Sequence, residues 1–313
     1  MRKFLKNIIV FCLIIFAVLC ISLLSPTPYA ASQSMLFSSL KKDSLLQNTP
    51  QPRIVLMGGS NVSYGMDSQL IKDSLEYNVI NTGIHAGLGL KYILEDIGPK
   101  LKSNDICIII PEYEQFYGAA PYGSEQLLRM IFDVSLTNAK KLNWSQIKII
   151  YRFIPQYVKS KLVIKNYYRS TLIIPYRHTA FNEYGDAYLH WDRQKVDYKT
   201  HPMKDEGNFN YDFFNYFVSY IHELEKKGII VYISFPGIEE ISYSHNGLIN
   251  GVYANLQKSD IKLLGTPEDF TIPESMTYDT PYHLTRKGIE KRTNALIHFL
   301  KKENISNTIS QQP

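Results

Sequence analysis

Short apolar runs that alternate with amphipathic segments are the feature that most constrains this fold. The runs lie at 53–57, 78–81, 105–110 and 228–235, and the third reads Asp-Ile-Cys-Ile-Ile-Ile. Runs this short and this apolar are typical of strands buried on both faces of a parallel sheet. Segments with helical periodicity follow them at 66–75, 88–101, 211–227 and 286–301. The alternation predicts an α/β fold with a mostly parallel sheet, in which 261–264 is a fifth strand.

The N-terminal segment is predicted to target the chain to a membrane. Arg2, Lys3 and Lys6 precede an apolar run from 8 to 24 that contains no charge. The run is long for a cleavable signal core and short for a membrane span, so a signal peptide and an anchor both fit 1–30. In either case the basic residues stay inside, and the rest of the chain is expected to be extracytoplasmic.

The remaining chain is predicted to divide into a folded domain and short flanking segments. We expect a polar tether at 31–52, the α/β domain at 53–301 with a helical insertion at about 120–205, and a polar tail at 302–313.

Charge and cysteine content exclude several classes of partner. The formal net charge is +5, and the three basic residues of the N-terminal segment account for all but +2 of it. A nearly neutral domain does not indicate nucleic-acid binding. Cys12 and Cys20 lie in the apolar segment, which leaves Cys107 alone in the domain and no disulfide available to it. No metal or organic cofactor is expected, because histidines at metal-ligand spacing are missing.

The predicted insertion has an uneven charge distribution. No acidic residue occurs from Val134 to Asn182, whereas nine basic residues lie between Lys140 and Arg177. Apolar and aromatic residues separate these basic side chains. The pattern fits a solvated face, and it also fits a surface for anionic lipid headgroups or an anionic polymer.

A serine follows the first predicted strand directly, after Gly58 and Gly59. Parallel sheets bind ligands at the carboxyl ends of their strands, so Ser60 is either part of a plain turn or a nucleophile at that edge. A serine nucleophile needs a base, most often a histidine steered by a carboxylate. His283 lies just before the last predicted helix, and Asp279 precedes it by four residues. These two residues are the best candidates for the base and its carboxylate.

The two motifs resemble the first and last blocks of the SGNH (GDSL-like) hydrolases. They read Gly-Gly-Ser-Asn around Ser60 and Asp-Thr-Pro-Tyr-His-Leu around His283. The likeness is closest to exported bacterial members that act near alginate O-acetylation and teichoic acid D-alanylation. It implies a three-layer, flavodoxin-like fold, with Ser60 as nucleophile, His283 as base and Asp279 as the residue that steadies the imidazolium. The stretch 181–186 also resembles an element of these exported members, to which the sequence assigns no chemical role.

The resemblance also implies an oxyanion hole beside Ser60 and Gly59. The stretch 79–90 is similar to the second block of the family, in which a glycine amide points at the oxyanion. Gly83 or Gly87 is the candidate here, and Gly87 is preferred, together with the amide of Ser60.

Two departures from the family pattern leave roles open. The third block normally brings an asparagine, and this chain has Glu112, Tyr113 and Glu114 instead. Tyr113 could donate from its hydroxyl, Glu112 could orient His283, or the two carboxyls could simply ring the pocket. The last block has one extra residue before its histidine, which leaves the reach of Asp279 open.

These implications predict an exported serine esterase or O-acyltransferase that acts on a cell-envelope polysaccharide or other glycan. A catalytically inactive glycan-binding protein of the same fold is the alternative, since it would show the same departures. A membrane-surface scaffold built on the basic insertion is a third hypothesis. The geometry at Ser60 and His283 distinguishes the enzyme from the binding protein.

Overall fold

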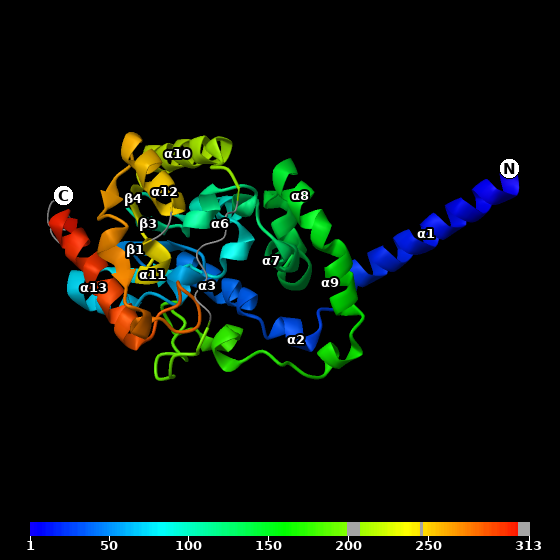
Figure 1. Ribbon diagram of the computed structural model, residues 1–313, viewed down its shortest axis with the longest axis horizontal. Coiled ribbons are helices and arrows are strands. Elements are labelled where there is room, and N and C mark those ends of the chain that lie inside the picture. Colours follow the sequence, from blue (N-terminus) through cyan, green and yellow to red (C-terminus); the bar gives the residue numbers. More distant parts are fainter. Residues whose placement is uncertain (199–206, 245–246, 306–313) are drawn as a thin grey trace.

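A five-stranded parallel sheet forms the centre of the computed structural model, which describes residues 1–198, 207–244 and 247–305 (Figure 1). Its strands lie in the order β2-β1-β3-β4-β6. This order is doubly wound: β2 lies on one side of β1, and β3, β4 and β6 follow on the other side, so the strand order switches between β1 and β3. All four pairings are parallel. The α/β class and the mostly parallel sheet are therefore confirmed. The strands are β1 (Arg53–Gly58), β2 (Asn78–Asn81), β3 (Ile106–Ile110), β4 (Ile230–Ser234) and β6 (Leu263–Leu264), and a separate pair is formed by β5 (Ile238–Glu239) and β7 (Thr271–Ile272).

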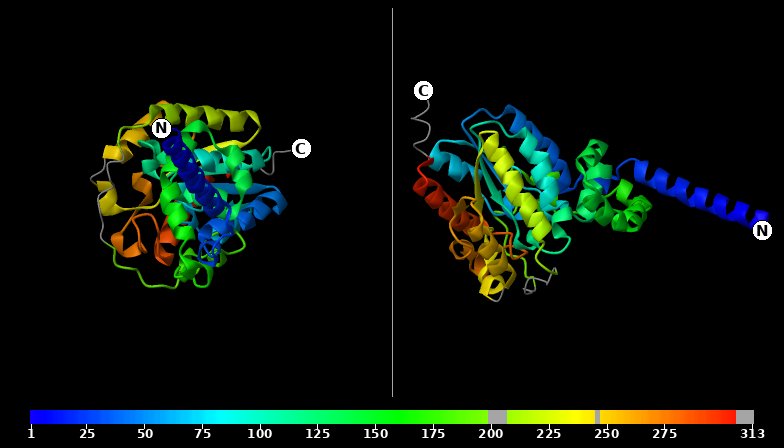
Figure 2. Two further views of the ribbon diagram at one scale, coloured as in Figure 1. Left: turned by 90° about the vertical axis from the view of Figure 1, so that its right-hand side faces the viewer. Right: turned by 90° about the horizontal axis from the view of Figure 1, so that it is seen from above.

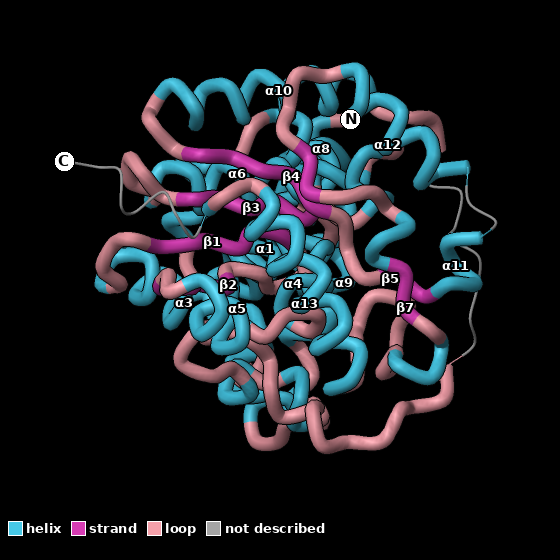
Figure 3. Tube along the Cα trace, turned by 90° about the vertical axis from the view of Figure 1, so that its left-hand side faces the viewer, coloured by secondary structure: helices cyan, strands magenta, loops and turns pink. Residues whose placement is uncertain are grey.

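Helices cover both faces of this sheet (Figure 2, Figure 3). Helices α6 and α10 pack together on one face, where the Tyr220 hydroxyl of α10 donates to the Leu94 carbonyl of α6 at 2.9 Å. Helices α5 and α13 cover the other face. The α-helices are α1 (Arg2–Leu24), α2 (Tyr29–Ser32), α3 (Ser38–Asn48), α4 (Ser60–Ser63), α5 (Ser68–Leu75), α6 (Leu90–Ile97), α7 (Glu125–Arg129), α8 (Trp144–Ile150), α9 (Ile154–Lys161), α10 (Tyr211–Lys226), α11 (Glu240–Ser244), α12 (Gly247–Lys258) and α13 (Arg286–Lys302).

A buried ion pair fixes the starts of the two central strands. Arg53 opens β1, and its guanidinium donates two hydrogen bonds of 2.7 Å to the carboxylate of Asp105, the residue before β3. Both side chains are fully buried. A bidentate pair has a defined geometry, so it fixes the register at one end of the sheet and leaves the carboxyl end open for loops.

The segment 31–52 differs from the polar tether expected for it. It forms α2, a short 3₁₀ turn at Met35–Phe37 and α3. Met35, Leu36 and Leu46 are buried, and so is the ammonium-bearing side chain of Lys42. The segment is polar on average, but a few of its apolar residues pack on the domain. The folded domain therefore begins well before β1.

The insertion is helical and lies between the sheet and the N-terminal helix (Figure 1, Figure 2). It contains α7, α8 and α9, joined by short 3₁₀ and π turns. Helix α1 is long and apolar enough to cross a membrane, and most of its surface is exposed. Of the expected insertion, 199–205 lies outside the described residues, as does 306–313 of the expected tail.

Candidate active site

Three loops at the carboxyl edge of the sheet bring polar side chains together. Ser60 follows β1, His85 follows β2, and Glu112 follows β3. These strands are neighbours, and the strand order of the sheet switches between β1 and β3. Ligands of open parallel sheets bind at such a reversal point. The site predicted around Ser60 therefore lies where the fold opens a crevice.

His283 is held by a carboxylate and a phenol. Its Nδ1 lies 2.9 Å from Asp279 Oδ1 and 3.2 Å from the Tyr176 hydroxyl. The Tyr176 hydroxyl also donates to the other carboxylate oxygen of Asp279. The residue added before His283 thus does not stop Asp279 from reaching the imidazole. With Nδ1 turned to the carboxylate, Nε2 is the nitrogen left to accept a proton.

The pKa of Asp279 is consistent with a steering role. Burial alone would raise the pKa of this carboxyl, but hydrogen bonds from His283 and Tyr176 outweigh it and hold the pKa below its usual value. Asp279 therefore stays ionised at neutral pH and can accept a hydrogen bond from His283 Nδ1, which fixes the orientation of the imidazole ring.

Tyr64 connects the serine helix to the histidine loop. Its amide donates to the Ser60 carbonyl at 2.9 Å, and its carbonyl accepts from the Leu284 amide at 3.1 Å. The Tyr64 ring stacks on the His283 imidazole with ring centroids 4.4 Å apart. Ser60 and His283 consequently lie at the same edge of the sheet. They form no direct hydrogen bond among the described residues, so a substrate or a water molecule would have to complete the contact.

Glu112 is the hydrogen-bond partner of the Ser60 hydroxyl. Its Oε1 lies 3.5 Å from Ser60 Oγ and accepts from the Asn61 amide at 3.3 Å. Burial, and then the nearby carboxylate of Glu114, raise the pKa of Glu112 to about 8 against the effect of these hydrogen bonds. At neutral pH the Glu112 carboxyl is mostly protonated, so it can donate a hydrogen bond where the third block of the family has an asparagine.

The glycine amides expected at the oxyanion are already bonded. The Gly87 amide donates to His85 Nδ1 at 2.9 Å, and the Gly83 amide donates to Asn81 Oδ1 at 3.0 Å. Neither is available to a substrate, because short polar side chains two residues upstream accept from both. The preference for Gly87 as oxyanion donor is therefore wrong.

Gly59 lets a different amide approach the serine. A side chain here would bring its Cβ to 2.9 Å from the Ala86 nitrogen and 3.0 Å from Glu112 Oε1. Only glycine allows this approach without displacing the neighbouring loops. Ser60 and Ala86 open short helices, so their amides have no acceptor within the helix and remain candidates to donate to an oxyanion.

The other residues of the third block have separate positions. Tyr113 is buried, and its hydroxyl has no partner in the part of the chain that the structure describes, so it does not reach the crevice. Glu114 accepts a hydrogen bond of 2.8 Å from the Tyr282 hydroxyl, next to His283 in the chain. Glu112 does not orient His283, since Asp279 and Tyr176 occupy its Nδ1.

A pocket of about 450 Å³ adjoins the crevice. Gly87, Glu112 and Glu114 line it on the sheet side, and Arg152 and Phe153 of the insertion line it opposite. The insertion thus forms one wall of the pocket that Glu112 lines from the sheet.

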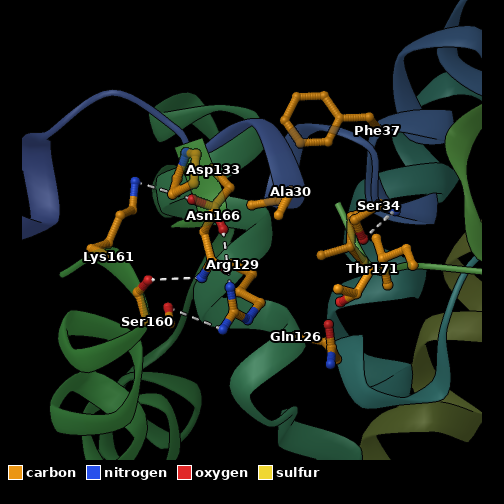
Figure 4. Close-up of a pocket in the computed structure, with 14 residues that line it drawn as sticks. Ala30, Ser34, Phe37, Gln126, Arg129, Asp133, Ser160, Lys161, Asn166 and Thr171 are labelled. Carbon is orange, nitrogen blue, oxygen red and sulfur yellow. Dashed lines mark hydrogen bonds and ion pairs between the residues drawn. The ribbon is translucent and has the colours of Figure 1, made fainter. Parts of the chain in front are cut away.

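A second pocket, of about 310 Å³, lies between the N-terminal segment and the insertion (Figure 4). Its charged groups bond to one another: Lys161 Nζ lies 3.2 Å from Asp133 Oδ1, and an Arg129 nitrogen lies 3.5 Å from Asp133 Oδ2. It shares no residue with the crevice. It is best described as the contact region between the N-terminal segment and the insertion.

The stretch 181–186 is hydrogen-bonded to the elements that surround Ser60. The Asp186 carboxylate accepts from the Ser68 amide and hydroxyl and from the Asn81 side chain at 2.7–2.9 Å. The Ala187 amide donates to the Ser63 carbonyl of α4 at 2.9 Å. This element therefore fixes α4 and β2, which accounts for a motif that the sequence left without a role.

Sequence reasoning missed three residues of the site: Tyr64, His85 and Tyr176. Tyr64 carried a usable signal, since it lies one helical turn after Ser60. His85 lies within the stretch compared with the second block, and burial together with the nearby His283 lowers its pKa to about 4. Tyr176 comes from the insertion, and no local pattern connects it with His283.

Comparison with protein-family models gave no match, and no curated protein is significantly similar to the chain. Among the described residues no group of histidine, cysteine, aspartate and glutamate has the arrangement of a metal site. Functional inference therefore depends on the crevice itself: a hydroxyl, a carboxylate-held imidazole, a protonated carboxyl and two amides at one edge of the sheet.

Proposed function

We propose that this protein is an SGNH-type serine esterase or O-acyltransferase that acts outside the cytoplasm on an acylated glycan of the cell envelope. The observation that supports this most is the arrangement of Asp279, His283 and Tyr64 beside the helix that begins with Ser60. A structural histidine does not need an ionised carboxylate on one nitrogen while its other nitrogen is left available beside a serine.

Ser60 Oγ attacks the ester carbonyl carbon, and its proton moves to His283 Nε2. The resulting imidazolium is stabilised by Asp279 across the Nδ1–H bond. When the tetrahedral intermediate collapses, the C–O bond to the leaving alcohol breaks, and His283 returns the proton to that alcohol. Water or a sugar hydroxyl then attacks the acyl carbon of the acyl-serine and gives its proton to His283. As the bond from the acyl carbon to Ser60 Oγ breaks, His283 returns that proton to Oγ and the acylated product leaves.

The oxyanion in this mechanism is bound by the amides of Ser60 and Ala86, with protonated Glu112 as a third donor. A neutral carboxyl can donate a hydrogen bond, whereas an ionised one would repel the developing charge. The raised pKa of Glu112 supports this assignment, because it keeps the proton in place at neutral pH.

The pocket between the crevice and the insertion is the proposed binding site for the glycan. Its wall combines the aromatic ring of Phe153 with the guanidinium of Arg152 and the carboxyls of Glu112 and Glu114. A mostly apolar pocket with an aromatic ring and a few charged groups can stack on the face of a sugar ring and hydrogen-bond to its hydroxyls.

An inactive glycan-binding protein is the second candidate. One observation favours it: the Ser60 hydroxyl bonds to Glu112 and not to His283. Catalytic hydrogen bonds are often long or incomplete before substrate binds, so this geometry does not decide against an enzyme.

A fluorophosphonate probe distinguishes the two candidates. We expect the purified protein to be labelled and the Ser60→Ala variant to remain unlabelled, whereas Ser145→Ala, at an exposed serine of α8, should label like the wild type. Equal labelling of wild type and Ser60→Ala would exclude Ser60 as nucleophile. If none of the three proteins is labelled, the binding protein becomes the better description.

A further inference from the structure

Exposed apolar side chains concentrate in the insertion. Beyond Met1 and α1, sixteen large apolar side chains in the described parts of the chain are exposed, and ten of them fall between Leu136 and Ile174. Trp144 is 67% exposed, Ile164 74% and Tyr168 77%. Exposed apolar side chains concentrated in one region of the chain are more typical of an interaction site than of a solvated face.

Helix α8 separates its apolar residues into two faces. Trp144, Ile147 and Tyr151 recur at helical spacing and are exposed, whereas Gln146 and Ile150 are buried. A third side of α8 lines the pocket beside the crevice. The exposed stripe is therefore not needed to hold α8 on the domain.

The exposed apolar residues after α9 lie where α1 leaves the domain. Lys161 Nζ, at the end of α9, donates to the carbonyls of Ser25 and Pro26 at 3.1 Å and 3.4 Å. The next residues along the chain are the exposed Leu162, Val163 and Ile164. The green helices of the insertion surround the base of α1 in both views of Figure 2. If α1 spans a membrane, this part of the insertion meets the membrane surface.

Basic side chains accompany the apolar ones. Lys148, Lys159, Lys165 and Arg169 are exposed and make no ion pair within the described residues. Two other basic residues of the region are used internally, because Lys141 pairs with Asp96 and Lys161 with Asp133. A surface with aromatic and aliphatic side chains between unpaired cations matches the interface of a bilayer with anionic headgroups.

We infer that this surface lies against an anionic lipid bilayer. The docking face, as we name it, comprises the exposed residues Trp144, Ile147, Lys148, Tyr151, Lys159, Leu162, Val163, Ile164, Lys165, Tyr168 and Arg169. The inference does not depend on the proposed chemistry, since it uses neither Ser60 nor His283.

The test uses the full chain in lipid nanodiscs and follows Trp144. The protein has two tryptophans, so Trp191→Phe leaves Trp144 as the single fluorophore. We expect lipids brominated in their acyl chains to quench Trp144 in phosphatidylglycerol-containing discs, less in phosphatidylcholine discs, and less again as salt rises. Replacing Lys148, Lys159, Lys165 and Arg169 by glutamine should lower the docked population about fivefold or more, since each cation near an anionic surface contributes about that factor.

The matched control removes four exposed basic residues at the opposite edge of the sheet. Lys226 and Lys227 lie at the C-terminal end of α10, and Lys301 and Lys302 lie at the C-terminal end of α13. Both helix ends are far from α1 (Figure 1). Replacing these four by glutamine should leave quenching unchanged. Unquenched Trp144 in anionic discs, or equal losses in both charge variants, would overturn the inference. The inference would also be overturned if this surface bound a soluble polyanion such as heparin while lipids left Trp144 unquenched. That outcome would identify a polymer-binding site.

Discussion

Glu112 lies where the SGNH-like pattern would have an asparagine, and this difference changes how an oxyanion could be stabilised. Asparagine donates at any pH, whereas a glutamate donates only while it is protonated. The carboxyl of Glu112 lies next to Glu114 and accepts from Ser60 and Asn61, and the net effect raises its pKa to about 8. The site is thus predicted to have an alkaline limit that the family pattern does not have.

Replacing Glu112 by glutamine tests this limit. In the wild type, ester hydrolysis should fall as pH rises through about 8, because Glu112 then loses its proton and places a negative charge beside the oxyanion. Glu112→Gln keeps a neutral donor, so its activity should persist above that pH. Below about pH 8, where the wild-type donor is protonated, Glu112→Ala should lose about a hundredfold in kcat, and above it the two proteins should converge. The measurement is the pH profile of kcat/KM, and an unchanged alkaline limb in the glutamine variant would contradict the assignment.

At this scale the sequence predicted which polar residues meet at the sheet edge better than it predicted the neighbours of those residues. Ser60, Asp279 and His283 meet there because each lies in a short motif whose position along the chain places it at that edge. The proposed role of the Ala86 amide could not be predicted, because it differs from the amides of Gly83 and Gly87 only in that, among the described residues, no nearby side chain accepts from it. Such local competition between acceptors is not visible in residue types.

At the scale of elements, a buried lysine holds the segment before β1 on the domain. Lys42 of α3 donates to the carbonyls of Gly83 and Gly185 and lies within 3.5 Å of the Ser63 hydroxyl. These groups belong to the loop after β2, the stretch 181–186 and the serine helix α4. One ammonium group therefore connects α3 to the three elements behind Ser60.

Removing this ammonium should loosen all three. Lys42→Met keeps most of the side-chain volume but leaves buried carbonyls without a donor, which we expect to cost about 3 kcal/mol of unfolding free energy. Lys41→Met is the matched control, since Lys41 is exposed and donates only to the Phe181 carbonyl at 2.9 Å. Its effect should stay below about 1 kcal/mol. Denaturant unfolding measures both, and equal effects would show that Lys42 has no special structural role.

The elements that sequence patterns predicted are those with apolar periodicity. All five strands of the main sheet were anticipated, and α10 and α13 begin and end within a residue of expectation. Helix α3 was missed because Leu46 is its only buried apolar residue and the others that it buries, such as Lys42, are polar, so no apolar stripe marks it. The strands β5 and β7 were missed because each is two residues long.

At the scale of the whole molecule, the residues after α1 belong to the folded domain. Thr27 donates to the Asp133 carbonyl at 3.0 Å, and Ser34 bridges to Arg177. The carbonyls of Ser25 and Pro26 accept from Lys161, which is buried. Cleavage after Ala31 would remove these acceptors and leave Asp133 as the remaining partner of a buried cation. Because of these contacts, we propose that α1 is retained as an anchor and is not removed as a signal.

This preference leads to a prediction about where the domain can be cut. A variant that begins at Ser25 keeps the acceptors of Lys161, and one that begins at Ser32 loses them together with the Thr27 bond. Each lost bond to a buried charge is worth about 1.5–3 kcal/mol, so the shorter variant should unfold at a temperature lower by about 5–10 °C. Lys161→Met should remove most of that difference, because the stranded cation is its cause. Thermal unfolding of the four proteins measures the effect, and mass spectrometry of the full chain from membranes should find residues 1–31 still attached. Equal stability of the two truncated variants, together with a native N-terminus at Ser32, would identify α1 as a cleaved signal.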